Sequence, residues 1–125
     1  MMDNQQKTKG PLEGIRVIEF AGLGPSPMCG MLLADMGAAV TIIDRPIKQG
    51  SRDIPMGGSR VLRRGKCSIA LDLKFEQDRH VAFDLINVSD ILLEGCRPGV
   101  MERLGFGPDV CLMKNPRLVF GRLSG

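Results

Sequence analysis

The sequence contains no tryptophan, no tyrosine and only five phenylalanines in 125 residues. Proteins that bind single-stranded nucleic acid usually stack bases on aromatic side chains, so this composition argues against that class. No apolar run approaches the roughly 20 residues that a transmembrane helix needs. The polar segment 1–10 also lacks the apolar stretch of a secretory signal. We therefore expect neither a nucleic-acid partner nor a membrane partner.

Histidine and paired cysteines are also scarce. Histidine occurs once, at position 80, and the four cysteines are widely spaced without any CxxC pair. Zinc sites of the familiar types need closer ligand spacings, so no metal site is predicted. Scattered cysteines are typical of reduced thiols in the cytosol, and we expect a cytoplasmic location. His80 follows Asp78 and Arg79 in a predicted helix, where a surface position is favoured over a catalytic one.

The length and composition fit one globular domain. A chain of 125 residues supports a single compact core but not two full domains. Hydrophobic residues make up 43% and charged residues 25%, which is ordinary for a folded domain. We expect residues 1–10 to form a flexible polar tail and residues 11–125 to form part of one α/β domain.

Short apolar segments alternate with helical patterns along that domain. Strands are predicted over residues 15–20, 39–43, 67–73, 90–94 and 118–123. Helices are predicted over residues 27–36, 75–88, 98–104 and 108–114. Ser26 is the expected N-cap of the first helix, with Pro27 in its first turn. This alternation predicts a mostly parallel sheet with flanking helices.

Positive charge is concentrated between Asp44 and Lys66. This segment contains seven basic and two acidic residues, for a net charge of +5, whereas the whole chain carries only +3. A basic segment on a nearly neutral domain indicates either a local anion site or a solvated loop. The basic residues are Arg45, Lys48, Arg52, Arg60, Arg63, Arg64 and Lys66.

Basic residues also follow three successive predicted strands. Arg45 follows the second strand, Lys74 the third, and Arg97 with Arg103 the fourth. Ligands of open α/β sheets bind at the carboxyl ends of the strands, and Gly95 permits close approach of a ligand to the backbone there. The pattern predicts an extended, phosphate-rich small molecule.

A dinucleotide cofactor is a weaker alternative for this ligand. Gly22 and Gly24 stand where the dinucleotide fingerprint would begin, after the first strand. Pro27 replaces the third glycine, however, and Pro25 removes one N–H donor from a phosphate cradle. A tight structural turn is the favoured interpretation of these glycines.

At these positions the sequence resembles the class III coenzyme A transferases, and within them the α-methylacyl-CoA racemases. The Asp44-Arg45-Pro46 form and the final residues 121–125 favour the racemase branch. The matching stretches are residues 11–19, 21–25, 33–38, 44–46, 64–66, 71–74, 94–105 and 115–119.

The resemblance implies a Rossmann-like large domain within an interlocked homodimer. It also implies that an acyl-coenzyme A is the partner, with coenzyme A as part of the substrate and no prosthetic group. The residues implied to hold coenzyme A are Arg45, Leu71, Asp72, Leu73, Lys74 and Arg103, with Gly95, Cys96 and Arg97 at the same edge.

The racemases of this family exchange the α-proton of a 2-methylacyl-CoA thioester through an enolate. Their catalytic His and Asp match positions beyond Gly125, so no catalytic residue is assigned here and we expect the chain alone to lack turnover. Two alternatives stay open. One is a coenzyme A transferase acting between carboxylic acids, and the other is a non-catalytic truncated product or subunit.

Overall fold

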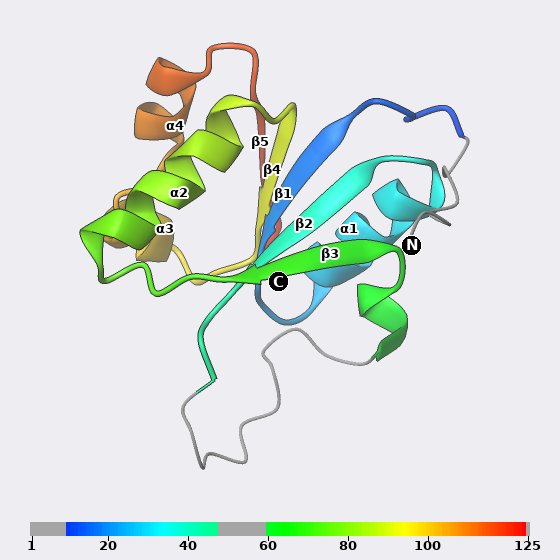
Figure 1. Ribbon diagram of the computed structural model, residues 1–125, viewed down its shortest axis with the longest axis horizontal. Helices are drawn as coiled ribbons and strands as arrows, with labels where there is room; N and C mark the ends of the chain where they lie inside the picture. The colour runs from blue at the N-terminus through cyan, green and yellow to red at the C-terminus, as the bar shows by residue number, and fades with distance from the viewer. Residues whose placement is uncertain (1–9, 48–59, 125) are drawn as a thin grey trace.

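The computed structural model describes residues 10–47 and 60–124 (Figure 1). The tail predicted for residues 1–9 and the basic residues Lys48 and Arg52 lie outside these ranges. In chain order the elements are β1 Arg16–Phe20, α1 Pro25–Asp35, β2 Ala39–Asp44, the 3-10 helix η2 Arg60–Arg63, β3 Lys66–Ala70, α2 Glu76–Asn87, β4 Ile91–Glu94, α3 Val100–Leu104, α4 Pro108–Lys114 and β5 Val119–Arg122.

The strands form one sheet in the order β3-β2-β1-β4-β5, and every pairing in it is parallel. The predicted α/β fold is therefore confirmed. The chain builds the sheet outward from β1 in one direction and then returns to add β4 on the other side. The strand order thus reverses between β1 and β4, which in such sheets is the usual place for a ligand.

Helices cover both faces of the sheet, as buried parallel strands require (Figure 1). On one face, α1 packs on an aliphatic cluster that includes Val17, Ala34, Val40 and Leu93. The other face carries α2, α3 and α4 over a larger cluster.

Phe106 forms the centre of that larger cluster and is fully buried. Its ring centroid lies 4.5 Å from that of Phe83 and 5.5 Å from that of Phe20. The Arg79 guanidinium carbon lies 5.5 Å from the centroid of the same ring, and Arg79 donates a hydrogen bond of 2.7 Å to the Leu104 carbonyl. One aromatic residue thus joins α2 to the sheet and to the segment that follows α3.

Most predicted boundaries differ from the observed ones by one or two residues, and the end of the third strand differs by three. The third strand ends at Ala70 instead of residue 73, because its partner β2 also ends, at Asp44. Asp72 then forms a turn, accepting a hydrogen bond from the Lys74 N–H and donating its own N–H to Asp78. Leu71 continues the alternating pattern only because its side chain enters the core.

The first helix starts at Pro25, with Gly24 as its N-cap at a φ of 82° and no side-chain cap. Ser26, the predicted cap, is instead fully buried within the helix. Proline fits the first helical position, and glycine adopts the left-handed φ without strain. The two residues before Ser26 therefore start the helix without its hydroxyl.

Candidate functional site

The loops that follow β1 and β4 lie against each other at the carboxyl edge of the sheet. A Cβ added to Gly95 would lie 3.0 Å from the Ser26 Cβ and 3.7 Å from the Leu23 carbonyl oxygen. A larger residue at position 95 would separate the two loops. Gly95 therefore brings together the two strand ends between which the strand order reverses.

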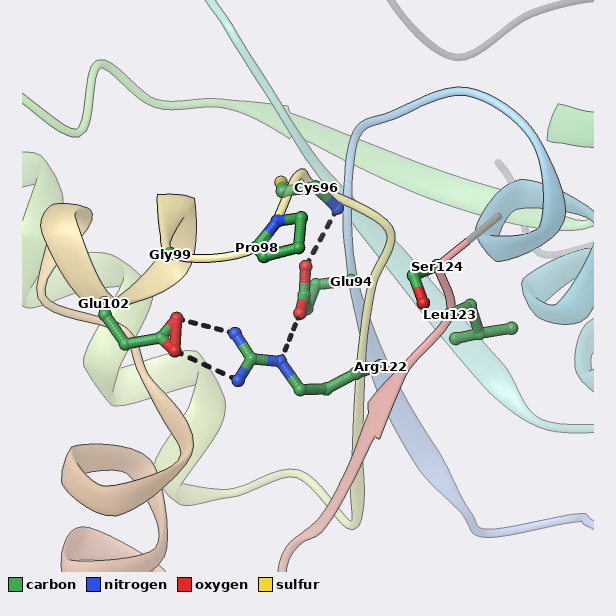
Figure 2. Close-up of a pocket in the computed structure, with 8 residues that line it drawn as sticks. All are labelled: Glu94, Cys96, Pro98, Gly99, Glu102, Arg122, Leu123 and Ser124. Carbon is green, nitrogen blue, oxygen red and sulfur yellow. Dashed lines mark hydrogen bonds and ion pairs between the residues drawn. The ribbon is translucent and has the colours of Figure 1, made fainter.

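A hollow of about 260 Å³ opens beside this junction, at the ends of β4 and β5 (Figure 2). The loop after β4 supplies one wall, and α3 and the end of β5 supply the others. Residues that line it include Glu94, Cys96, Pro98, Gly99, Glu102 and Arg122.

Arg122 ties these walls together through two carboxylates. Its Nε donates to Glu94 at 2.7 Å, while Nη1 and Nη2 donate to the two oxygens of Glu102 at 3.0 and 2.6 Å. The second oxygen of Glu94 accepts the Cys96 N–H at 2.9 Å. The guanidinium lowers the pKa of Glu102, and both carboxylates raise the pKa of Arg122.

A second hollow, of about 340 Å³, lies at the ends of β2 and β3. Arg45 and Ile47 line one part of it, and Ser68 and Ala70 line another. The ion pair between Asp44 and Arg63 completes its wall. The chain thus has a concave surface on each side of the β1 end.

The predicted cations Arg45, Lys74, Arg97 and Arg103 are all exposed, and within residues 10–47 and 60–124 none forms an ion pair. Arg45 lines the second hollow. The Nη1 of Arg103 lies 3.7 Å from a Cβ added to Gly99, at the first hollow. The positive charges of Arg45 and Arg122 act to lower the pKa of the Cys96 thiol, against the larger effects of burial and Glu94.

The other residues predicted to hold coenzyme A differ in how far their side chains are buried. Leu71 is buried in the core, and the partly buried Leu73 packs against the same cluster, so both side chains contribute to core packing. Asp72 is committed to the turn described above. Gly95 and Cys96 stand at the junction of the loops and at the first hollow.

Three cations of the basic segment hold the fold instead of an anion. Lys66 lies 2.6 Å from Glu19 and is almost fully buried with it. Arg64 pairs with Asp35 at 2.6 Å, and Arg63 pairs with Asp44, as noted above. The solvated-loop interpretation does not apply to the buried Lys66 or to Arg63, whereas Arg64, with 54% of its side chain exposed, stays in contact with solvent.

Neither His80 nor Cys96 has the environment of an activated catalyst. His80 exposes 73% of its side chain and lies 3.7 Å from Glu76 one turn earlier, which confirms its surface position. Burial, together with the charge of Glu94, raises the pKa of the Cys96 thiol. Among residues 10–47 and 60–124, no group of three or more metal-ligating side chains is assembled. No helix in those ranges is long and apolar enough to cross a membrane.

Comparison of the sequence with models of protein families shows which family this α/β domain belongs to. The model of CoA-transferase family III matches residues 12–125. The chain belongs to CoA-transferase family III. This confirms the family resemblance seen in the sequence motifs.

Curated relatives within CoA-transferase family III include both racemases and transferases. Human α-methylacyl-CoA racemase is 49% identical over 115 residues, covering 91% of this chain and 28% of the relative. A formyl-CoA:oxalate CoA-transferase of Escherichia coli is 37% identical over 123 residues, covering 92% of this chain and 30% of the relative. The chain therefore spans less than a third of the length of these two relatives.

Solved structures similar to this chain share the fold described above. A crystal structure of a protein from Mycobacterium tuberculosis superposes with a TM-score of 0.79 at 37% identity, over 90% of this chain and 32% of that one. A CAIB/BAIF family protein from Brucella suis gives a TM-score of 0.78 at 26% identity, over 94% and 34% of the two chains.

The linkage of Glu94, Arg122 and Glu102 was not found from the sequence. One signal was available: Glu94 and Arg122 both stand near the ends of predicted strands. They are direct partners in the β4–β5 register. Recognising the pair required knowing that these two strands are neighbours. Placing Glu102 required the position of α3 as well.

Proposed function

We propose that this chain is the coenzyme A-binding N-terminal portion of an enzyme resembling the α-methylacyl-CoA racemases. The observation that carries the proposal is the set of exposed cations, unpaired within the described ranges, at the carboxyl edge of the sheet. They are Arg45, Lys74, Arg97 and Arg103. By contrast, Arg63, Arg64, Lys66 and Arg122 are bound to carboxylates.

The distribution of these cations suits the nucleotide end of coenzyme A. That end carries a 3′-phosphate and a diphosphate, which arginine and lysine bind through charge-assisted hydrogen bonds. Arg45 stands at one hollow and Arg103 beside the other, with the strand-order reversal between them. We assign the phosphates to Arg45, Lys74 and Arg103. Arg97 and the backbone of residues 71–73 complete the contacts.

The loop after β4 supports the approach of the thioester arm. Gly95 and Gly99 carry no side chains, and the Cys96 N–H is held by Glu94. A ligand anchored by its phosphates at this edge is restrained before any reaction occurs. Remote binding of this kind positions the reacting group and lowers the entropic part of the barrier. The chain's role in the reaction is therefore binding and orientation.

We further propose that the complete protein is a homodimer that exchanges the α-proton of a 2-methylacyl-CoA, with its acid–base pair beyond residue 125. The 49% identity to human α-methylacyl-CoA racemase favours this activity. Transfer of coenzyme A between carboxylic acids is the second candidate, supported by 37% identity to a formyl-CoA:oxalate CoA-transferase. Sequencing beyond residue 125 discriminates between them. A Gly-His-Asp stretch shortly after it favours the racemase, and a lone aspartate nucleophile favours the transferase.

Isothermal titration with coenzyme A and with its dephospho form tests the binding function. We expect coenzyme A to bind more tightly, because the dephospho form lacks the 3′-phosphate. Arg45→Gln and Arg103→Gln are each expected to weaken binding of coenzyme A about tenfold or more, since a hydrogen bond to a charged group contributes about 1.5–3 kcal/mol.

Arg117→Gln provides the matched control for these variants. Arg117 is exposed and forms no ion pair within the described ranges, but it precedes β5 at the opposite edge of the sheet. Its replacement should leave the affinity unchanged. Undetectable heats of binding with both ligands would overturn the proposed phosphate site. An equal loss of affinity for coenzyme A in Arg45→Gln, Arg103→Gln and Arg117→Gln would also overturn it.

A further inference from the structure

We propose that Arg122 is a positioning residue for coenzyme A binding: it fixes α3 through Glu102 and thereby sets the position of Arg103. The inference rests on the proposed function, because it assigns to Arg103 a phosphate of the ligand. It gives a role to a residue outside the predicted set of coenzyme A ligands.

All three nitrogens of the Arg122 guanidinium are engaged within the chain. Figure 2 shows the group between Glu94 and Glu102, with Nε toward the first and both terminal nitrogens toward the second. Glu94 is 3% exposed, so one end of this bridge is anchored in the protein interior. Arg122 is therefore a fixed link between the sheet and α3, not a free cation awaiting an anion.

The helix that receives this link depends on contacts with the rest of the protein for its position. It has five residues, Val100–Leu104, and lies between Gly99 and Gly105, which both adopt left-handed φ values. Helices this short are unstable without contacts to the rest of the protein. Met101 anchors the inner side of α3, being fully buried. Elsewhere on α3, Glu102 accepts two parallel hydrogen bonds from Arg122, and this bidentate geometry restricts the orientation of its carboxylate.

Arg103 follows Glu102 directly, so a contact that fixes the backbone of α3 at Glu102 also fixes the point from which the Arg103 side chain extends. Its backbone N–H donates to the Gly99 carbonyl at 3.0 Å, and its guanidinium folds back beside Gly99. Rotation or fraying of α3 would move Arg103 away from the hollow that Gly99 lines. The linkage through Glu102 opposes that movement.

A double-mutant cycle on the affinity for coenzyme A tests this role. Arg122→Lys keeps the charge but cannot make the two parallel bonds to Glu102. We expect it to weaken binding about three- to tenfold when Arg103 is present, and to have no further effect in an Arg103→Gln background. Glu102→Gln, examined in the same cycle, should behave in the same way. Circular dichroism and the thermal midpoint of each variant establish that it is folded.

The cycle separates a positioning role from a purely structural one. General loosening of the fold would weaken binding by the same factor in both backgrounds, and that additivity would overturn the inference. Arg117→Lys, at the opposite edge, should have no effect in either background. If the unsubstituted chain does not bind coenzyme A, the proposed function fails and this inference with it. If the chain binds and the effects are additive, only the inference fails.

Discussion

The ammonium nitrogen of Lys66 lies 2.6 Å from a carboxylate oxygen of Glu19, and the two side chains expose only 1% and 2% of their surfaces. The same nitrogen donates to the Pro27 carbonyl at 2.9 Å. The pair therefore connects β3, β1 and α1 in the interior. Burial raises the pKa of Glu19, although the charge and hydrogen bond of Lys66 act in the opposite direction.

Removing one partner of this pair should destabilise the fold strongly. Lys66→Met leaves the Glu19 carboxylate buried and unpaired, and we expect the free energy of unfolding to fall by about 3–5 kcal/mol. Urea unfolding measures the change. In the double variant Glu19→Gln, Lys66→Met no charge remains buried, so its loss should be smaller than that of Lys66→Met alone. An equal decrease in the free energy of unfolding in the single and double variants would show that the unpaired carboxylate is not the cause.

Gly30 on α1 makes room for the same pair. A Cβ added there would lie 1.8 Å from the Glu19 Oε1 and 3.0 Å from the Lys66 Nζ. We expect Gly30→Ala to lower the free energy of unfolding by at least about 1–3 kcal/mol, in spite of alanine's higher helix propensity. Gly22→Ala is the control, because the nearest heavy atom to its added Cβ is 3.9 Å away. If Gly30→Ala leaves the free energy of unfolding unchanged or raises it, Glu19 and Lys66 are not held in place as described here.

The bridge between Arg122 and Glu102 should contribute to acid sensitivity. Arg122 lowers the pKa of Glu102 in the folded chain. This contribution to stability is therefore fully present above 4.5, the ordinary pKa of this carboxyl, and is lost as pH falls through the lower folded value.

Thermal unfolding midpoints recorded from about pH 6 downward measure this sensitivity. Glu102→Gln should lose less stability on acidification than the unsubstituted chain. Glu13→Gln, which removes an exposed carboxylate that has no ion pair in the described ranges, should retain the original acid dependence. Parallel curves for Glu102→Gln and the unsubstituted chain would contradict the bridge.

The four cysteines should react at very different rates with a thiol reagent. Cys67 is exposed on β3, whereas Cys29 and Cys96 are partly buried and Cys111 is fully buried. Burial raises the pKa of Cys111 to about 11 and also raises the pKa of Cys29 and of Cys96. The thiolate is the reactive form, so a single fast thiol per folded chain is expected at neutral pH.

Cys67→Ser should abolish that fast phase and leave three thiols that react slowly or only after unfolding. The absorbance of the product released by a chromogenic disulfide reagent, followed over time, gives the number of fast and of slow thiols. A second fast thiol in the unsubstituted chain would contradict the burial described here.

The fold could be predicted from the sequence because its strands are short, apolar and separated by helical patterns. Helix α4 was predicted with its observed bounds, and Gly105 ends α3 as expected. The end of β3 could not be predicted, because the alternation through Leu73 reflects core packing and not strand pairing. Where a strand ends depends on its neighbour, and a single strand's pattern does not contain that information.

The candidate site was predictable only in part. Parallel strands place their carboxyl ends at one edge, so the position of Arg45 and Lys74 just after β2 and β3 follows from the topology. The topology does not show that Arg45 and Arg103 stand at two different hollows, or that Lys74 lines neither. The pairing of Lys66 with Glu19 did not follow, because these residues are 47 positions apart and meet across an intervening strand. Counting charges in a loop does not show which of them are already neutralised by distant carboxylates.

The most direct test of coenzyme A binding is a backbone amide spectrum of the isotope-labelled chain, recorded with and without coenzyme A. We expect coenzyme A to move the amide resonances of Arg45, of Lys74 and of residues 95–103. The resonances around Arg16 and Arg117, at the opposite edge of the sheet, should not move. Shifts confined to that opposite edge, or no shifts at saturating ligand, would contradict the proposed binding.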